Sequence, residues 1–123
     1  MKLFKRRGYE MTLNRIHDTI VIREDNEKLT LTVNGDAMRM VAGLTKAQEK
    51  MKALTNDTPD EEVKAVAEYF AAVIFGREQA SKLMAFYADD PGCVISVCGK
   101  YFKERLAEKI TKAQKRMKVD KTV

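Results

Sequence analysis

The sequence predicts an α+β fold, in which a small antiparallel sheet over residues 10–34 is followed by three to four helices over residues 36–118. Three observations predict it. Apolar residues alternate with polar ones in the first third of the chain, and they recur every three or four positions in the rest. With 45% apolar and 33% charged residues, a chain of 123 residues can also build one domain with its own core. No linker rich in Pro, Gly or Ser divides it, so we expect a single domain over residues 1–123.

Two alternating segments predict a β-hairpin. Residues 19–23 (Thr-Ile-Val-Ile-Arg) and 29–33 (Leu-Thr-Leu-Thr-Val) follow the two-residue period of a strand. The polar residues 24–28 between them predict a connecting loop of about five residues. Met11 and Leu13 alternate as well, which leaves room for an earlier strand that reaches Ile16.

The period changes from two to about 3.6 after Asn34-Gly35, where we expect the sheet to end. Asp36 is placed to cap a following helix. The apolar residues of that helix are spaced 4, 3, 4 and 3 apart on one stripe, and they are Met40, Leu44, Ala47, Met51 and Leu54. The helix should stop at residues 55–57.

A second start signal follows at once. We expect Thr58 to be the N-cap and Pro59 the first helical residue, because the acids after them suit the positive end of the helix dipole. The stripe of this helix consists of Val63, Val66, Phe70 and Val73, widened by Ala67, Ala71 and Ile74. Gly76 is expected to end it. A shorter helix then covers residues 77–87, with Ala80, Leu83, Met84 and Tyr87 on its apolar side.

The last helix is expected over residues 91–118, after a break at residues 89–92. Its inward residues are Val94, Val97, Cys98, Tyr101, Phe102, Leu106 and Ile110. Beyond Ile110 only Ala113 and Met117 continue the stripe. The final two turns are therefore predicted to project from the domain.

Charge is segregated along the chain. Residues 1–8 carry four bases and no acid, and residues 100–123 carry nine bases and three acids, a net of +6. The segment 9–99 has a net charge near −5, so the overall +5 describes a dipolar molecule. Such a molecule can attract anionic partners at its ends or associate with its own copies. The sequence leaves open whether residues 1–8 and 119–123 are ordered.

Catalysis and metal binding find little support in the residue pattern. The single histidine, His17, lies at the edge of a predicted strand, where a surface role is favoured over that of a base. Cys93 and Cys98 are five apart, about 500° around a helix, so we expect two free, buried thiols rather than a disulfide or a zinc site. No glycine-rich phosphate loop is present. We therefore expect no enzyme activity, no catalytic residue, no cofactor and no metal.

The basic C-terminal face consists of Lys109, Lys112, Lys115, Arg116 and Lys118. It can be a solvated helix end, the contact for a protein partner, or a nucleic-acid site that tracks phosphates. The acidic middle of the chain stands against nucleic acid, and so does the lack of an aromatic residue for base stacking within this face. The first two interpretations are favoured.

Seven methionines are many for this length. Four of them lie on or beside helical stripes, namely Met38, Met40, Met51 and Met84. Methionine adapts to irregular neighbours, so it serves either to fill a core or to line a groove for apolar helices of another chain. Core filling is the favoured interpretation.

The second half of the chain, residues 61–118, contains a run of packing and turn signals. After an acidic helix start come Ala-Ala-Val-Ile-Phe-Gly at 71–76, Ala-Ser-Lys-Leu-Met-Ala-Phe-Tyr at 80–87, the turn Asp90-Pro91, and a terminal helix with Tyr101-Phe102 and a lysine-rich end at 109–118. In this arrangement the chain resembles small tail assembly chaperones encoded by long-tailed bacteriophages and by prophages of Gram-positive bacteria. Its hairpin start is also similar to theirs.

The resemblance implies a non-enzymatic protein that coats the helical tape-measure protein, keeps its apolar stripes from aggregating and hands it over as tail-tube subunits polymerise. The expected partner is the tape-measure protein or another phage tail protein, and the charge dipole would let copies align as a homo-oligomer. The interaction candidates are Phe70, Ile74, Leu83, Met84 and Tyr87, and core packing is the favoured alternative for each. Tyr101 and Phe102 are assigned to the core.

Two rival functions stay open. The chain could be a small nucleic-acid-binding protein that uses its basic ends, or a structural component of the finished tail. No apolar run is long enough to cross a bilayer, and the first residues do not form a secretory signal. We therefore expect a protein of the host bacterial cytoplasm with no membrane partner.

Overall fold

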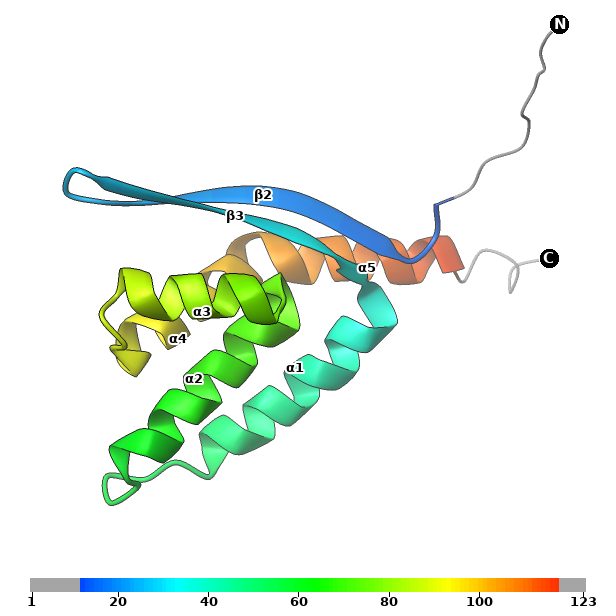
Figure 1. Cartoon of the computed structure of the whole chain (residues 1–123). Coiled ribbons are helices and arrows are strands. Elements are labelled where there is room, and N and C mark those ends of the chain that lie inside the picture. The colour runs from blue at the N-terminus through cyan, green and yellow to red at the C-terminus, as the bar shows by residue number, and fades with distance from the viewer. Residues whose placement is uncertain (1–11, 118–123) are drawn as a thin grey trace, which may run out of the picture.

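A two-stranded antiparallel sheet lies across a layer of helices in the computed structural model, which describes residues 12–117 (Figure 1). In chain order the elements are β2 (Arg15–Glu24), β3 (Glu27–Asp36), α1 (Ala37–Lys52), α2 (Asp60–Phe75), α3 (Arg77–Phe86), α4 (Pro91–Tyr101), η1 (Phe102–Leu106) and α5 (Ala107–Met117). The predicted α+β fold is confirmed. The sheet packs directly on the helices, because β3 contacts α1, α2 and α3 while β2 contacts α5.

The hairpin is longer and tighter than the sequence predicts. β2 and β3 pair along their whole length, from Arg15 opposite Asp36 to Glu24 opposite Glu27. Two residues connect the strands, and Asp25 takes a positive φ of 54°, as tight hairpin turns require. The predicted five-residue loop is wrong, because the charged residues beside the turn are exposed strand residues at a tip that extends beyond the helices (Figure 1).

One face of the hairpin packs on the helices. Ile16, Leu31 and Val33 are buried there, and Ile20, Ile22 and Leu29 are partly buried, while the residues that alternate with them, such as Thr32, are exposed. This alternation is the two-residue period that predicted the strands. Ile16, where an earlier strand would end, belongs to β2, and Met11 lies outside the described residues.

The predicted helix starts are confirmed in one case and corrected in another. Asp36 caps α1 as expected, since its Oδ1 accepts a hydrogen bond from the Arg39 N–H at 3.0 Å. Thr58 does not cap α2, which begins after Pro59. The Thr58 hydroxyl instead accepts from the Thr55 N–H at 2.8 Å and so holds the preceding loop together. Gly76 ends α2 with a positive φ of 89°, which a residue with a Cβ rarely adopts.

The long C-terminal helix runs through a π-helical turn, η1, between α4 and α5. Its buried side chains are Val94, Cys98, Tyr101, Leu106, Ile110 and Ala113. Every interval among them is three or four except the five residues from Tyr101 to Leu106. A π turn accommodates one extra residue, so it keeps Leu106 and the residues after it on the buried face. The sequence predicted one regular helix over this stretch.

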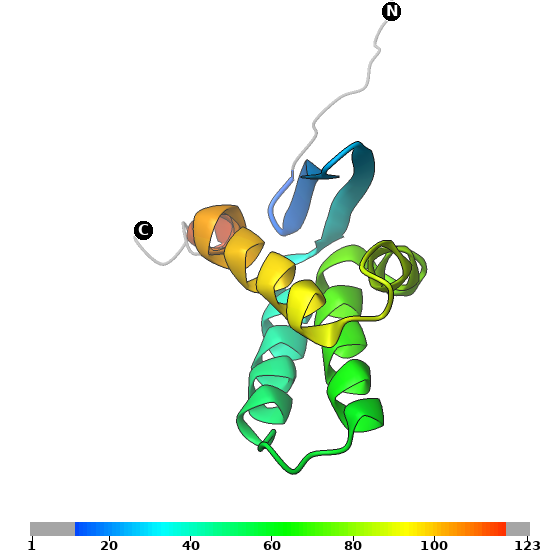
Figure 2. The same cartoon turned by 90° about the vertical axis from the view of Figure 1, so that its left-hand side faces the viewer.

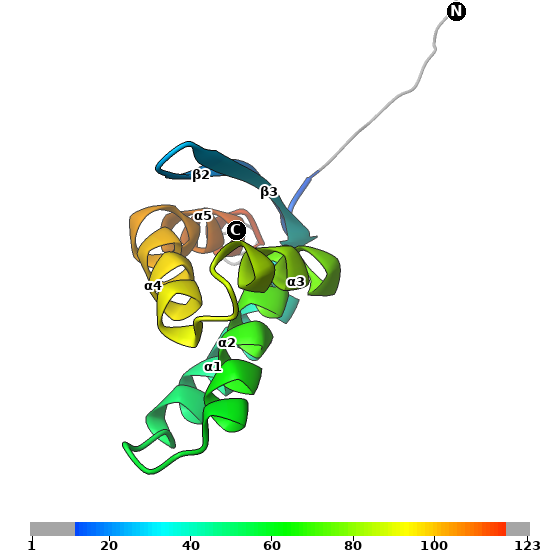
Figure 3. The same ribbon diagram turned by 60° about the vertical axis from the view of Figure 1, so that its left-hand side comes forward.

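The last turns of α5 pack against the body, so the prediction that they project is wrong. Ala113 is fully buried, and Arg116 donates from Nε to the Leu13 carbonyl oxygen at 3.1 Å and from Nη2 to that of Arg15 at 3.4 Å. Figures 1 and 3 show α5 lying beneath the hairpin. Ala113 and the bonds from Arg116 to the backbone hold this end of the helix. A stripe of large apolar residues in the sequence does not reveal contacts of this kind.

Small residues let α1 and α2 approach closely. A Cβ atom on Gly43 would lie 2.8 Å from Cγ1 of Val73, so only glycine fits this contact without a shift. Ala47 and Ala67 are also fully buried. The two helices form a pair whose connecting loop lies at the opposite end of the molecule from the hairpin (Figure 2). Across residues 12–117, no helix is both long and apolar enough to span a membrane.

Candidate functional site

An apolar groove of about 450 Å³ lies between α1, α2 and the C-terminal helix. Helix α1 contributes half of its residues, and the other helices close the remaining sides. The lining residues are Val41, Leu44, Thr45, Gln48, Met51, Phe70, Phe102, Ala107, Ile110 and Thr111. None of them is charged, so the groove suits apolar side chains.

Two hydroxyls at the edge of this groove, those of Thr45 and Thr111, are already satisfied. The Thr45 hydroxyl donates to the Val41 carbonyl oxygen at 2.9 Å, and the Thr111 hydroxyl donates to the Ala107 carbonyl oxygen at 3.0 Å. Both bonds lie within a single helix. Both hydroxyls would therefore keep a hydrogen-bond partner when an apolar occupant covers them.

Three large apolar side chains of the groove are only half-buried, namely those of Leu44, Met51 and Phe102. Phe70, at 6% exposed, belongs to the core beneath them. A second apolar surface laid along the groove would remove them from water, a gain of roughly 25 cal/mol per Å² buried. An amphipathic helix offers such a surface as a row of side chains three and four residues apart. The chemistry of the groove therefore suits the apolar face of a helix.

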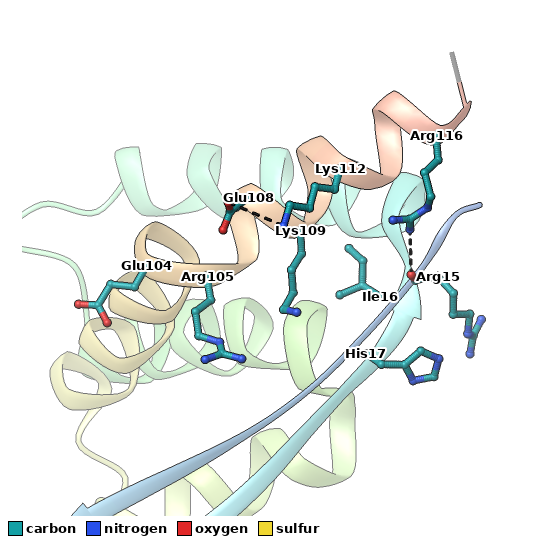
Figure 4. A pocket seen from close by; sticks show the side chains of 9 residues that line it. All are labelled: Arg15, Ile16, His17, Glu104, Arg105, Glu108, Lys109, Lys112 and Arg116. Carbon is teal, nitrogen blue, oxygen red and sulfur yellow. Dashed lines mark hydrogen bonds and ion pairs between the residues drawn. The ribbon is translucent and has the colours of Figure 1, made fainter. Parts of the chain in front are cut away.

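A second cleft of about 480 Å³ is polar and lies between β2 and the C-terminal helix (Figure 4). It is lined by Arg15, Ile16, His17, Glu104, Arg105, Glu108, Lys109, Lys112 and Arg116. Five of these residues are Arg or Lys and two are Glu, which gives the lining a net charge of +3. This cationic cleft can hold an anionic group.

The cations of the cleft are only partly neutralised. Lys112 Nζ lies 3.9 Å from the Glu108 carboxylate, and both side chains are largely exposed, so their ion pair is weak. Arg15 donates from Nε to Asn34 Oδ1 at 3.1 Å. Lys109 forms no ion pair with any residue in the described part of the chain. Arg15 points away from the two lysines (Figure 4), and Arg105 is paired with Asp18, so Lys109 and Lys112 carry the positive charge that is left for an anionic partner.

Beside the cleft, a carboxylate ties the hairpin to the C-terminal helix. Asp18 projects from the buried face of β2, with 7% of its side chain exposed. It accepts hydrogen bonds from Arg105 at 2.7 and 2.9 Å and from the Tyr101 hydroxyl at 2.9 Å. Burial alone would raise the pKa of Asp18, but these bonds and one from the Thr19 N–H outweigh it and hold the pKa below its ordinary value.

The five interaction candidates named from the sequence do not form one surface. Ile74, Leu83 and Met84 are buried at 2%, 0% and 7% exposed, so they stabilise the core and are not available to a partner. Phe70 lines the apolar groove. The Tyr87 hydroxyl donates to Glu24 at 2.8 Å. Burial and this bond raise the pKa of Tyr87 to about 12.

The basic C-terminal face is divided by the structure. Lys109, Lys112 and Arg116 line the cationic cleft, whereas Lys115 is exposed and does not line it. Lys118 lies outside the described residues. The face therefore contributes one wall of a cleft rather than a continuous charged stripe.

Sequence reasoning missed the parts that complete both surfaces. Leu44 and Met51 were recognised on the stripe of α1, but a stripe does not say which part its neighbours leave uncovered. Ala107 and Thr111, small residues in a charged helix, were the available signal for the groove. Residues 15–17 line the cleft together with residues that lie some ninety positions later in the sequence. No local sequence pattern indicates a contact between segments so far apart.

The single histidine and the two cysteines lie in different surroundings. His17 is exposed on β2. Cys93 and Cys98 are both free as expected, but only Cys98 is buried, whereas Cys93 is partly exposed. Burial raises the pKa of the Cys98 thiol to about 12, which keeps it protonated. Within residues 12–117, no three His, Cys, Asp or Glu side chains come together in a way that could hold a metal ion.

Comparison with known proteins adds no relative. No family model, curated protein or solved structure matches the chain. Its function must therefore be argued from the apolar groove, the cationic cleft and the residue pattern.

Proposed function

We propose that this chain is a non-enzymatic tail assembly chaperone of a long-tailed phage or prophage, which binds the helical tape-measure protein in the host bacterial cytoplasm. The observation that carries the proposal is the uncharged groove between α1 and α5, where Leu44, Met51 and Phe102 are half-exposed. The groove has the shape and chemistry to receive an apolar helix. The resemblance of residues 61–118 to such chaperones supports the same client.

The lining of the groove suits a client that is long and varied. A tape-measure helix presents many apolar segments of different sequence, so its chaperone has to accept imperfect matches. Met51 and Phe102 supply a flexible and a broad apolar contact, respectively. Binding at each segment is then moderate in strength. Moderate binding permits release when the tail tube assembles around the client.

The first test is co-expression with the longest helical protein encoded beside this chain, followed by size-exclusion chromatography with mass detection. Wild-type chain should co-elute with that client in several copies and keep it soluble. Met51→Glu should weaken binding at least roughly tenfold, because a charge in the groove must lose its water when the client docks. Met51 is only partly buried, so the variant should still fold.

The matched control is Met38→Glu. Met38 is also on α1, is 57% exposed and does not line the groove, so this variant should bind the client like wild type. Thr111→Trp provides a second groove variant, which fills the groove without adding charge. The proposal fails if the client stays insoluble with wild-type chain. It also fails if both groove variants, folded by circular dichroism, bind as well as Met38→Glu.

A further inference from the structure

The two outer edges of the hairpin differ in what occupies them. On the β3 side, the Thr32 N–H donates to Gln79 Oε1 at 2.8 Å, and Gln79 Nε2 donates to the Thr32 carbonyl oxygen at 2.7 Å. Nε2 also donates to the Phe75 carbonyl oxygen at 2.7 Å, which fixes the side-chain amide in place. A side chain that uses the backbone groups of an edge prevents another strand from pairing there. The edge of β3 is therefore closed at its middle.

The edge of β2 is closed only at its base, where Arg116 donates to the carbonyl oxygens of Leu13 and Arg15. Thr19 lies opposite Thr32, so the backbone groups of residues 17, 19, 21 and 23 also point away from the partner strand. Among residues 12–117, one hydrogen bond uses these groups, from the Thr19 N–H to the Asp18 carboxylate at 2.9 Å. We call residues 17–23 the open edge.

Apolar groups flank the open edge on both faces of the sheet. Val21 is 48% exposed on the outer face. Ile20 and Ile22 point toward the helices but are only partly buried. Figure 1 shows this part of the hairpin running toward a tip that extends past the helices. A strand added here would pair with unused backbone groups and remove apolar surface from water at the same time.

Charge at the open edge favours an acidic neighbour. Arg23 lies directly opposite Lys28, and neither forms an ion pair with another residue of the range 12–117. Like charges in such a cross-strand pair destabilise a sheet, so a carboxylate beside Arg23 would offset the repulsion. Glu24, the next residue, accepts a hydrogen bond from the Tyr87 hydroxyl instead. The outward row of β2 at residues 15, 17, 19, 21 and 23 contains no carboxylate, so the same strand of a second copy cannot supply one.

We propose that the open edge binds an extended segment of a partner protein as a third, antiparallel strand of the sheet. The segment carries apolar side chains toward Ile20 and Ile22, a β-branched side chain beside Val21 and a carboxylate beside Arg23. Main-chain hydrogen bonds supply the affinity, and these side chains supply the selectivity. The occupant is a strand, so this surface is separate from the apolar groove and does not depend on the helical client.

The test follows backbone amide hydrogen exchange of the full chain by nuclear magnetic resonance. The probe is a synthetic peptide of about nine residues that alternates valine with threonine and carries a glutamate near its N-terminus, the end beside Arg23 in antiparallel pairing. At saturating peptide, the amides of residues 17, 21 and 23 should exchange at least roughly tenfold more slowly. The amides of Ile20 and Ile22 already face β3 and should change little.

Two proline variants form a matched pair. Val21→Pro removes an outward N–H but no bond to β3, so it should weaken peptide binding at least roughly tenfold. Thr30→Pro changes the residue directly opposite, whose N–H faces the other edge, and it should bind like wild type. Arg23→Glu tests the charge without proline. It should bind the glutamate peptide at least roughly threefold more weakly and prefer a peptide with lysine at that position.

The proposal is overturned if wild type does not bind the glutamate peptide at about millimolar concentration, or if binding leaves the amides of residues 17, 21 and 23 unprotected. Equal affinities of the two proline variants, both folded by circular dichroism, would also contradict it. Protection of the same amides without peptide, rising with protein concentration, would assign the edge to a second copy instead. These measurements do not involve the groove, so the open edge and client binding can fail independently.

Discussion

Asp18 ties the hairpin to the C-terminal helix through its side chain. It is a charged side chain on the buried face of a strand, where the alternating pattern calls for an apolar residue. Arg105 and Tyr101 compensate by donating three hydrogen bonds to it. The five-residue interval of η1 includes Arg105, so the π turn and the carboxylate belong to one arrangement.

Asp18→Asn should destabilise the chain by about 1 kcal/mol at pH 7, because the charge-assisted bonds to Arg105 weaken. The loss stays modest, since Arg105 is 56% exposed and solvent screens the pair. Urea unfolding provides the measurement. Glu108→Gln, which breaks the exposed pair with Lys112, should change stability by less than about 0.5 kcal/mol. Equal losses for the two variants would contradict the role given to Asp18.

The same residue predicts a pH dependence. The pKa of Asp18 is lowered in the folded chain from its ordinary value of 3.8, so its ionised form stabilises the fold. That contribution is complete above the unfolded pKa and is lost as pH falls through the folded pKa. The stability gap between wild type and Asp18→Asn should therefore be constant from about pH 7 to about pH 5 and shrink below about pH 4. A gap that widens in acid would show that the sign is wrong.

At the scale of elements, the π turn follows from the spacing of buried residues. Deleting the exposed Lys103 shortens the interval from Tyr101 to Leu106 to four, which a regular α-helix accommodates with the stripe intact. This deletion should cost less than about 2 kcal/mol, whereas deleting Lys112 should cost more because it rotates buried Ala113 away from the core. Thermal unfolding by circular dichroism compares them. Similar losses for both deletions would contradict this explanation of η1.

The sequence predicted elements well where one signal dominates. Asp36 and Gly76 are strong boundary residues for local reasons, namely a capping carboxylate and a positive φ, and both lie where expected. The hairpin loop was predicted too long because Glu24 and Glu27 are polar. Polar residues occur at exposed strand positions as well as in loops. The π turn was missed because Phe102, four residues before Leu106, also fits an inward stripe.

At the scale of the whole molecule, α5 separates the two candidate surfaces. With about 100° of rotation per residue, Ala107 and Thr111 lie on one flank of the helix and Lys112 and Arg116 on another. The first pair lines the apolar groove and the second lines the cationic cleft. An occupant of the groove therefore leaves the cleft uncovered.

Charge segregation was visible in the sequence, but its arrangement was not. The net charges of residues 100–123 and 9–99 predicted a dipole. Only the fold shows that residues 15–17, from the acidic middle segment, line the same cleft as the C-terminal lysines. Only the pairing of α1 with α2 shows that the acids in the first turn of α2 lie at the opposite end of the molecule from the hairpin (Figure 2). Long-range placement of this kind depends on tertiary packing, which no local pattern encodes.

The most direct test of the central claim is methyl nuclear magnetic resonance during titration with an amphipathic helical segment of the tape-measure protein. We expect the methyl signals of Leu44, Met51 and Ile110 to shift or broaden, because these groups line the groove. Signals of the core residues Leu83 and Val94 should stay in place. Perturbation confined to Ile16 in the cleft, or no perturbation at saturating peptide, would contradict the claim that the groove binds the client.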